Sequence, residues 1–280
     1  MNNGIRRNFN PGYVKREFER IDKALTGKTV MYVIGGAVMA LRGLKTGTKD
    51  IDVVVETKKS AVELIEGLKN CGYYQLLAAD LSKAYNDLSA VILENEDGFR
   101  WDIFIKVVAH KLFISDHMKK RTTLMYSGIK LTAMEVSNED IFLLKGVTER
   151  DSDIDDMYQL ARSGIDYDTV YSECLFQSRN SERIWEIALY GQCNDLEKTY
   201  GVVVPFMKKL RSEGETKMLQ LLMRQILEKG PITEEKLLTY NTELKKADIK
   251  SGLKMLKKRK EIVRYPDGTI ALVKKLNTNS

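Results

Sequence analysis

The strongest constraint on the fold is the stretch 29–56, where a short apolar run is followed by two glycines and then by two spaced acids. Val30 to Ile34 is rich in β-branched and aromatic residues and stops at Gly35-Gly36, which predicts a buried strand. The apolar residues after the glycines fall at helical spacing, so a helix is expected to begin there. Its unsatisfied backbone N–H groups would face the glycine turn, where a phosphate can approach closely.

The two acids, Asp50 and Asp52, lie in a run of β-branched residues that predicts a second strand. Side chains alternate across a strand, so both carboxylates face the same side, roughly 6 to 7 Å apart along the chain. Neighbouring carboxylates repel each other, and a divalent cation between them removes that cost. Mg²⁺ prefers a few carboxylates together with the phosphate oxygens of a substrate. The pair therefore predicts a site for Mg²⁺ or Mn²⁺.

A third acid, Asp102, lies in another strand-like run, from Phe99 to Val107. It is the best candidate for completing a two-metal site. The alternative is a carboxylate on an edge strand that faces water. Its aromatic neighbours favour the metal site.

Three elements in this order resemble the signature of the DNA polymerase β-like nucleotidyltransferase superfamily: Gly35-Gly36, Asp50-x-Asp52 and the strand acid Asp102. The resemblance covers roughly residues 28–165. It is closest to small stand-alone members, including abortive-infection toxins, in which a Thr-Lys pair precedes the acids as Thr48-Lys49 does here. Many members have Gly-Ser in place of the glycine pair, so one hydroxyl contact to phosphate is absent from this chain.

The resemblance implies transfer of a nucleoside monophosphate from a nucleoside triphosphate to a hydroxyl acceptor, with release of pyrophosphate. The three aspartates would hold Mg²⁺ or Mn²⁺, and the glycine pair would cradle the β and γ phosphates, with Thr48 and Lys49 also at the nucleotide. The acceptor could be RNA, a protein side chain or a small molecule. One alternative is a non-catalytic DNA-binding regulator that keeps the fold as a nucleotide sensor. An interaction scaffold would leave the glycine pair and the acid spacing unexplained.

A second charged patch follows a helix start at Ser137-Asn138-Glu139-Asp140 and resembles a patch of the same stand-alone proteins. If one helix carried the whole patch, Asp153 and Asp156 would share a face, with Lys145 about two turns earlier. The functional hypothesis places Lys145 on the triphosphate and makes one of the two acids an acceptor contact or base. The alternative is an exposed helix held by short-range ion pairs.

The chain's 280 residues are enough for two cores, and a formal charge of +6 permits an anionic partner. Cys71, Cys174 and Cys193 lack the spacing of a metal site and are expected to be free thiols, buried in the fold. No apolar run approaches the ~18 to 20 residues of a membrane span, and the start is too charged for a secretory signal. A cytoplasmic protein without a membrane partner is expected.

The predicted organisation is an α/β (α+β) nucleotidyltransferase domain with a mixed sheet (1–136), a helical segment that completes the cleft (137–205) and a small C-terminal domain (206–280). The C-terminal domain has three predicted helices and a hairpin, an order that resembles a winged helix-turn-helix domain. Its third helix is rich in lysine, and four side chains could contact the phosphates of tRNA or DNA: Lys250, Lys254, Lys257 and Lys258. Protein recruitment or homodimer contacts are the alternatives.

Overall fold

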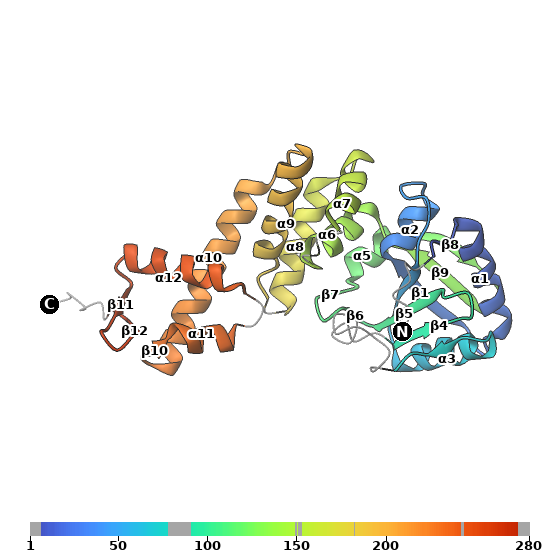
Figure 1. Cartoon of the computed structure of the whole chain (residues 1–280), viewed down its shortest axis with the longest axis horizontal. Helices are drawn as coiled ribbons and strands as arrows, with labels where there is room; N and C mark the ends of the chain where they lie inside the picture. Colours follow the sequence, from blue (N-terminus) through green and yellow to red (C-terminus); the bar gives the residue numbers. More distant parts are fainter. Residues whose placement is uncertain are drawn as a thin grey trace.

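The computed structural model describes residues 7–77, 91–148, 150, 153–181, 183–241 and 244–273. These residues form a mixed α/β structure drawn out along one axis, with a large sheet at one end, helices in the middle and a smaller unit at the other end (Figure 1). The predicted fold class is therefore confirmed. No helix in the described ranges is long and apolar enough to cross a membrane.

The large sheet has seven strands in the order β3-β4-β5-β2-β1-β9-β8. It is mixed, because β1 runs parallel to β9 and β2 runs parallel to β5, while the other neighbours are antiparallel. The strands are β1 Thr29–Ile34, β2 Asp50–Val55, β3 Tyr74–Gln75, β4 Val91–Glu94, β5 Arg100–Ile105, β8 Thr123–Ser127 and β9 Leu131–Glu135.

Four helices accompany this sheet: α1 Pro11–Ala24, α2 Gly35–Leu41, α3 Lys58–Asn70 and α5 Asp116–Arg121. Helix α1 begins at a proline, and the Asn10 side chain caps it by accepting a hydrogen bond from the Tyr13 N–H. Helix α3 packs closely on the end of α1, since a Cβ on Gly67 would lie 2.8 Å from Leu25 Cδ2. The buried ring of Phe18 on α1 meets Trp101 of β5 edge to face.

The residues Asn95 to Gly98 are typical of a turn, and they join β4 and β5 as an antiparallel hairpin. The apolar runs at 73–78 and 89–93 predict two strands, and the structure has strands there over Tyr74–Gln75 and Val91–Glu94. Residues 73, 76 and 77 of the first expected strand are not in a strand, and residues 78, 89 and 90 lie outside the described residues. After β5, a short hairpin of β6 Val107–Val108 and β7 Leu112–Phe113 leads into α5.

The middle of the molecule is helical and consists of α6 Asn138–Thr148, α7 Asp153–Arg162, α8 Tyr167–Ser181, α9 Trp185–Tyr200 and the long α10 Met207–Lys229. The condition of one helix through Lys145 and Asp156 is not met, because α6 ends at Thr148 and a new helix begins at Asp153. Two thiols in this part, Cys174 and Cys193, are free and buried as expected, whereas Cys71 is only partly buried.

The C-terminal unit has a hydrophobic core of its own, from Met218 on α10 to Ile270. It contains α11 Glu234–Tyr240, α12 Lys246–Lys258 and a three-stranded sheet in the order β10-β12-β11. Its strands are β10 Ile232–Thr233, β11 Ile262–Arg264 and β12 Thr269–Leu272. The three helices and the hairpin agree with the sequence prediction, which missed β10. Helix α10 is shared, since Leu210 belongs to the core of the larger part.

Candidate active site

The turn between β1 and α2 lies directly against an acid of the neighbouring strand. Gly35 has a φ of +68°, and a Cβ built on it would lie 2.6 Å from Asp52 Oδ2, so both the backbone conformation and the contact require glycine. A Cβ on Gly36 would lie 3.3 Å from Thr48 Oγ1 and 3.9 Å from Lys45 Nζ. Because α2 spans only 7 residues, its dipole is small, and the side chains around the turn carry most of the charge at this place.

Three predicted acids lie on one face of the sheet. The parallel register of β2 and β5 pairs Asp52 with Asp102, and side chains at paired positions of neighbouring strands point the same way. Asp50, two residues before Asp52, shares that face. Asp102 is 2% exposed and lies on an interior strand between β4 and β2, so the alternative of an edge-strand carboxylate facing water is wrong.

The charge on Asp52 is disfavoured by its surroundings. Loss of hydration raises its pKa to about 7, and the neighbouring Asp50 carboxylate adds to the shift, while Lys145 and Arg150 oppose it. A bound cation would offset this cost, so the chemistry of the donors suits a divalent ion. In the part of the chain that the structure describes, no three His, Cys, Asp or Glu side chains are grouped as around a metal. Mg²⁺ needs only one or two carboxylates when phosphate oxygens supply the other ligands.

Opposite the sheet, two lysines form a cluster of ion pairs with the acids of α7. Lys145 Nζ lies 2.7 Å from Asp153 Oδ1 and 2.9 Å from Asp156 Oδ2. Lys45, from the loop after α2, places its Nζ 2.7 Å from Asp156 Oδ1, so the two lysines share one carboxylate. The alternative for this patch was an exposed helix held by ion pairs. The ion pairs are present, but the helix face is not exposed, because Asp153 is 4% and Asp156 is 6% exposed.

The two acids of α7 are occupied in holding these cations. The Asp153 carboxylate also accepts a hydrogen bond of 2.6 Å from the Thr148 hydroxyl. Burial works to raise the pKa of Asp156, but the ammonium groups of Lys145 and Lys45 outweigh it and lower that pKa. Burial likewise works to lower the pKa of Lys145, and the two aspartates outweigh it and raise that pKa. The Asp156 carboxylate and the Lys145 ammonium are thus both charged near neutral pH, and each acid of α7 is paired with a lysine.

A cleft of about 440 Å³ lies between the acidic face of the sheet and the lysine cluster. All the residues predicted for a nucleotide, metal or acceptor contact line it: Gly35, Gly36, Thr48, Lys49, Asp50, Asp52, Asp102, Lys145, Asp153 and Asp156. The four predicted lysines of α12 do not. Thr48 also has a structural role, because its hydroxyl donates to the Asp50 carbonyl and its backbone pairs with Phe9 at the start of β2.

The cleft also contains functional groups that the sequence prediction missed. Lys45 is the clearest case, and Asn8, Thr148 and Arg150 line the cleft as well. The signal for Lys45 is a cation in the short loop between the glycine turn and the Thr48-Lys49 pair.

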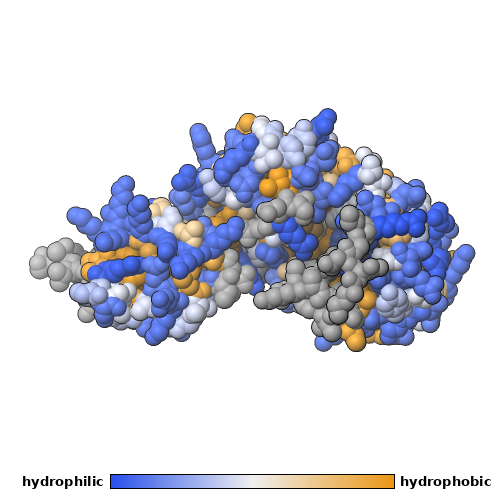
Figure 2. All heavy atoms as spheres, viewed as in Figure 1, coloured by the Kyte–Doolittle hydropathy of each residue, from blue (hydrophilic) through white to orange (hydrophobic). Residues whose placement is uncertain are grey.

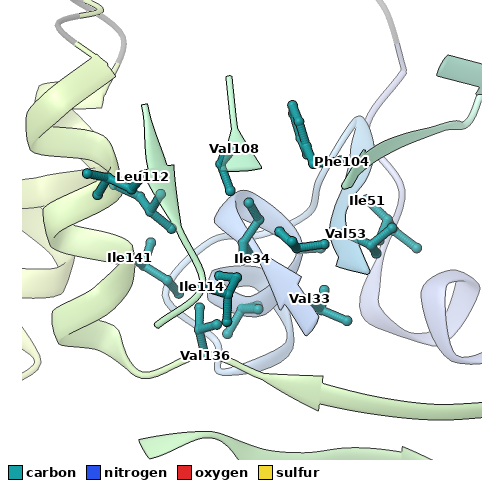
Figure 3. Close-up of a cluster of buried hydrophobic side chains, with 14 of the residues drawn as sticks. Val33, Ile34, Ile51, Val53, Phe104, Val108, Leu112, Ile114, Val136 and Ile141 are labelled. Carbon is teal, nitrogen blue, oxygen red and sulfur yellow. The ribbon is translucent and has the colours of Figure 1, made fainter. Parts of the chain in front are cut away.

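One wall of the cleft is apolar. Ile34, Phe104, Val108 and Ile141 line it and belong to the cluster of buried side chains beneath the cleft (Figure 3). Within the loop after β5, three non-glycine residues have positive φ: Lys106 at 62°, Ala109 at 49° and His110 at 56°. Such backbone is costly for residues with a Cβ and is common at functional sites. Ala109 lies on the cleft itself.

Comparison with known proteins places this cleft in a family context. No curated protein matches the chain. Residues 14–186 match a family described as nucleotidyltransferase of unknown function (DUF6036), a span of more than half of the chain that includes every strand and helix around the cleft. The C-terminal unit lies outside the matched span. The chain therefore belongs to this nucleotidyltransferase family.

Proposed function

We propose that the chain transfers a nucleoside monophosphate from a nucleoside triphosphate to a hydroxyl acceptor, as a member of the DNA polymerase β-like superfamily. The observation that carries this proposal is that acidic and basic side chains line opposite sides of one cleft. Three aspartates of the sheet face two lysines and Arg150 across about 440 Å³, a size that suits a nucleotide.

The residues of the cleft divide into two roles in this proposal. Asp50, Asp52 and Asp102 would hold Mg²⁺ or Mn²⁺, which when bound neutralises phosphate charge and lowers the pKa of the acceptor hydroxyl. Lys45 and Lys145 would each contact phosphate oxygens, since Lys45 Nζ lies beside Gly36 at the glycine turn. The acceptor hydroxyl would lose its proton to solvent, and its oxygen would form a bond to the α phosphorus as the bond to pyrophosphate breaks. Most of the rate would come from positioning and electrostatic stabilisation.

The C-terminal unit is proposed to be a winged helix that contacts nucleic acid. Lys250, Lys254, Lys257 and Lys258 are exposed, and their spacing places them on one face of α12. Hydrophilic side chains project from the α12 side of this unit (Figure 2). The same lysine face is the observation that favours the second candidate function, a DNA-binding regulator that uses the cleft only to sense a nucleotide.

Transfer and sensing are separated by a labelling experiment. The parent, Asp52→Asn and Asp102→Ala proteins are incubated with each α-labelled nucleoside triphosphate, Mg²⁺ and fractions of RNA, protein and small molecules. Transfer of label by the parent, lost in Asp52→Asn and in Asp102→Ala, is the expected result. Asp116→Asn, which changes a carboxylate on the surface at α5, is the matched control and should keep activity. Binding of nucleotide by the parent without transfer to any fraction would reject the enzyme and favour the sensor.

A further inference from the structure

A short segment before α1 forms part of the cleft wall. Its residue Asn8 lines the cleft, and a Cβ built on Gly47 would lie 3.5 Å from the Asn8 Cβ. Gly47 belongs to the loop between α2 and β2, from which five residues line the cleft: Lys45, Thr46, Gly47, Thr48 and Lys49. The segment and this loop are thus in direct contact beside the cleft.

The next residue, Phe9, pairs with the loop through its backbone. The Phe9 N–H donates to the Thr48 carbonyl at 2.7 Å, and the Thr48 N–H donates to the Phe9 carbonyl at 3.0 Å, which makes an isolated antiparallel bridge. The loop approaches closely, because a Cβ on Gly47 would lie 2.7 Å from the Phe9 carbonyl oxygen. Gly47 has no positive φ, so glycine is required there by this contact and not by the backbone conformation.

The side chain of Phe9 anchors the segment in the hydrophobic core. It is 2% exposed, and its ring centre lies 4.6 Å from that of Tyr13 and 4.7 Å from that of Phe99. Tyr13 is in the first turn of α1, and Phe99 directly precedes β5, the strand that carries Asp102. The segment therefore stays where it is unless a buried ring is exposed to water.

Thr48 connects this anchored segment to the glycine turn. Its hydroxyl donates to the Asp50 carbonyl at 2.8 Å and lies 3.3 Å from the position that a Cβ on Gly36 would take. Lys45 Nζ lies 3.9 Å from that same position. The loop is thus held between Phe9 on one side and the glycine turn on the other, with the ammonium group of Lys45 next to the turn.

We propose that Phe9 is a positioning residue of the nucleotide site. Through its bridge to Thr48 it holds the loop between α2 and β2 against the glycine turn, so that Lys45 keeps its place beside the bound phosphates. The inference rests on the proposed binding of a nucleoside triphosphate in the cleft. Phe9 acts through the loop, because its own ring is buried between α1 and β5. A loop that is ordered before the nucleotide arrives loses less conformational freedom on binding, and this raises the affinity.

The test measures the affinity of the full chain for ATP, GTP, CTP and UTP, each with Mg²⁺, by calorimetry. Phe9→Ala should weaken the binding about tenfold, since small displacements of a binding group cost this much. Phe9→Leu keeps an apolar anchor and should restore most of the affinity. Gly47→Ala disturbs the same contact from the side of the loop, because its Cβ would meet the Phe9 carbonyl, and should also weaken binding.

Two variants away from the cleft are the matched controls. Phe206 is also a buried ring, 4% exposed, and packs against Tyr171 with ring centres 5.5 Å apart. Phe206→Ala therefore removes a similar side chain without touching the loop. Gly191→Ala adds a Cβ that meets nothing within 4 Å. Both controls should bind nucleotide like the parent, and an equal loss in Phe206→Ala would overturn the positioning role.

Hydrogen exchange of the loop gives a readout without nucleotide. The Thr48 N–H, which donates to Phe9, should exchange faster in Phe9→Ala than in the parent or in Phe206→Ala. Parental exchange or parental nucleotide affinity in Phe9→Ala would overturn the inference. If Phe9→Ala does not fold, Gly47→Ala decides, since it leaves the buried ring in place, and parental affinity there would refute the role. Faster exchange in a chain whose parent binds no nucleotide would sustain the hold on the loop and reject the proposed function.

Discussion

Replacing Asp52 by Asn should make the protein more stable at alkaline pH, although it damages the cleft. The pKa of this carboxyl is about 7 in the folded chain against 3.8 without the fold. A carboxyl with a raised pKa contributes stability that is fully present below about pH 4 and is lost as the pH rises through about 7. About three pKa units correspond to on the order of 4 kcal/mol, at about 1.36 kcal/mol per unit. The asparagine side chain carries no charge at any of these pH values, so the variant lacks this loss of stability.

The assay is urea denaturation of the parent and Asp52→Asn between pH 4.5 and 8.5, without metal or nucleotide. The difference in free energy of unfolding should be small near pH 4.5 and should grow to several kcal/mol in favour of Asp52→Asn by pH 8. Asp116→Asn, at the exposed start of α5, should show no such trend. A constant difference across the range, or a parent that is the more stable protein at pH 8, would refute the idea that Asp52 is a poorly hydrated charge.

Three further changes test the cleft and the basic helix. Gly35→Ala should lower the free energy of unfolding by more than Gly43→Ala does. Both positions have positive φ, which costs alanine about 1 to 2 kcal/mol, but only at Gly35 would the new Cβ also meet Asp52. Equal losses in urea denaturation would contradict this. Lys45→Gln should weaken nucleoside triphosphate binding about tenfold in calorimetry while Lys58→Gln does not, and an unchanged affinity would remove Lys45 from the phosphates. Gln at Lys250, Lys254, Lys257 and Lys258 should lower both affinity for tRNA and its salt slope with the fold intact, and parental binding would leave α12 to protein contacts.

The position of the acidic face could be predicted because it depends on local patterns. Because side chains alternate along a strand, Asp50 and Asp52 must lie on the same face of the sheet. The glycine pair marks the residue at which β1 ends. The pairing of Asp52 with Asp102 depends on the register of two strands that are fifty residues apart. The sequence could only suggest that contact, since no local signal determines which strand lies beside β2.

The lysine cluster shows what the sequence could not supply. The sequence indicates Lys145, Asp153 and Asp156 as a group, but their spacing along a single helix does not describe their geometry, because they lie on two helices. The break after Thr148 lets α7 turn back against α6, and this tertiary contact brings both acids to one ammonium group. Lys45 joins them from a loop that is a hundred residues away in the chain. Spacing along a helix cannot predict contacts of this kind.

The shared acid explains how the cleft can keep two ammonium groups close to the proposed phosphate site before a nucleotide arrives. A buried lysine without a partner would lose its proton or destabilise the fold. The free energy lost when its ammonium group leaves water exceeds the attraction it gains from distant charges. Asp156 holds both Lys45 and Lys145, and Asp153 holds Lys145 a second time. An arriving triphosphate would thus meet cations that are already charged and oriented, so little reorganisation is needed on binding. The aspartates of α7 would then contribute to nucleotide affinity without touching the nucleotide.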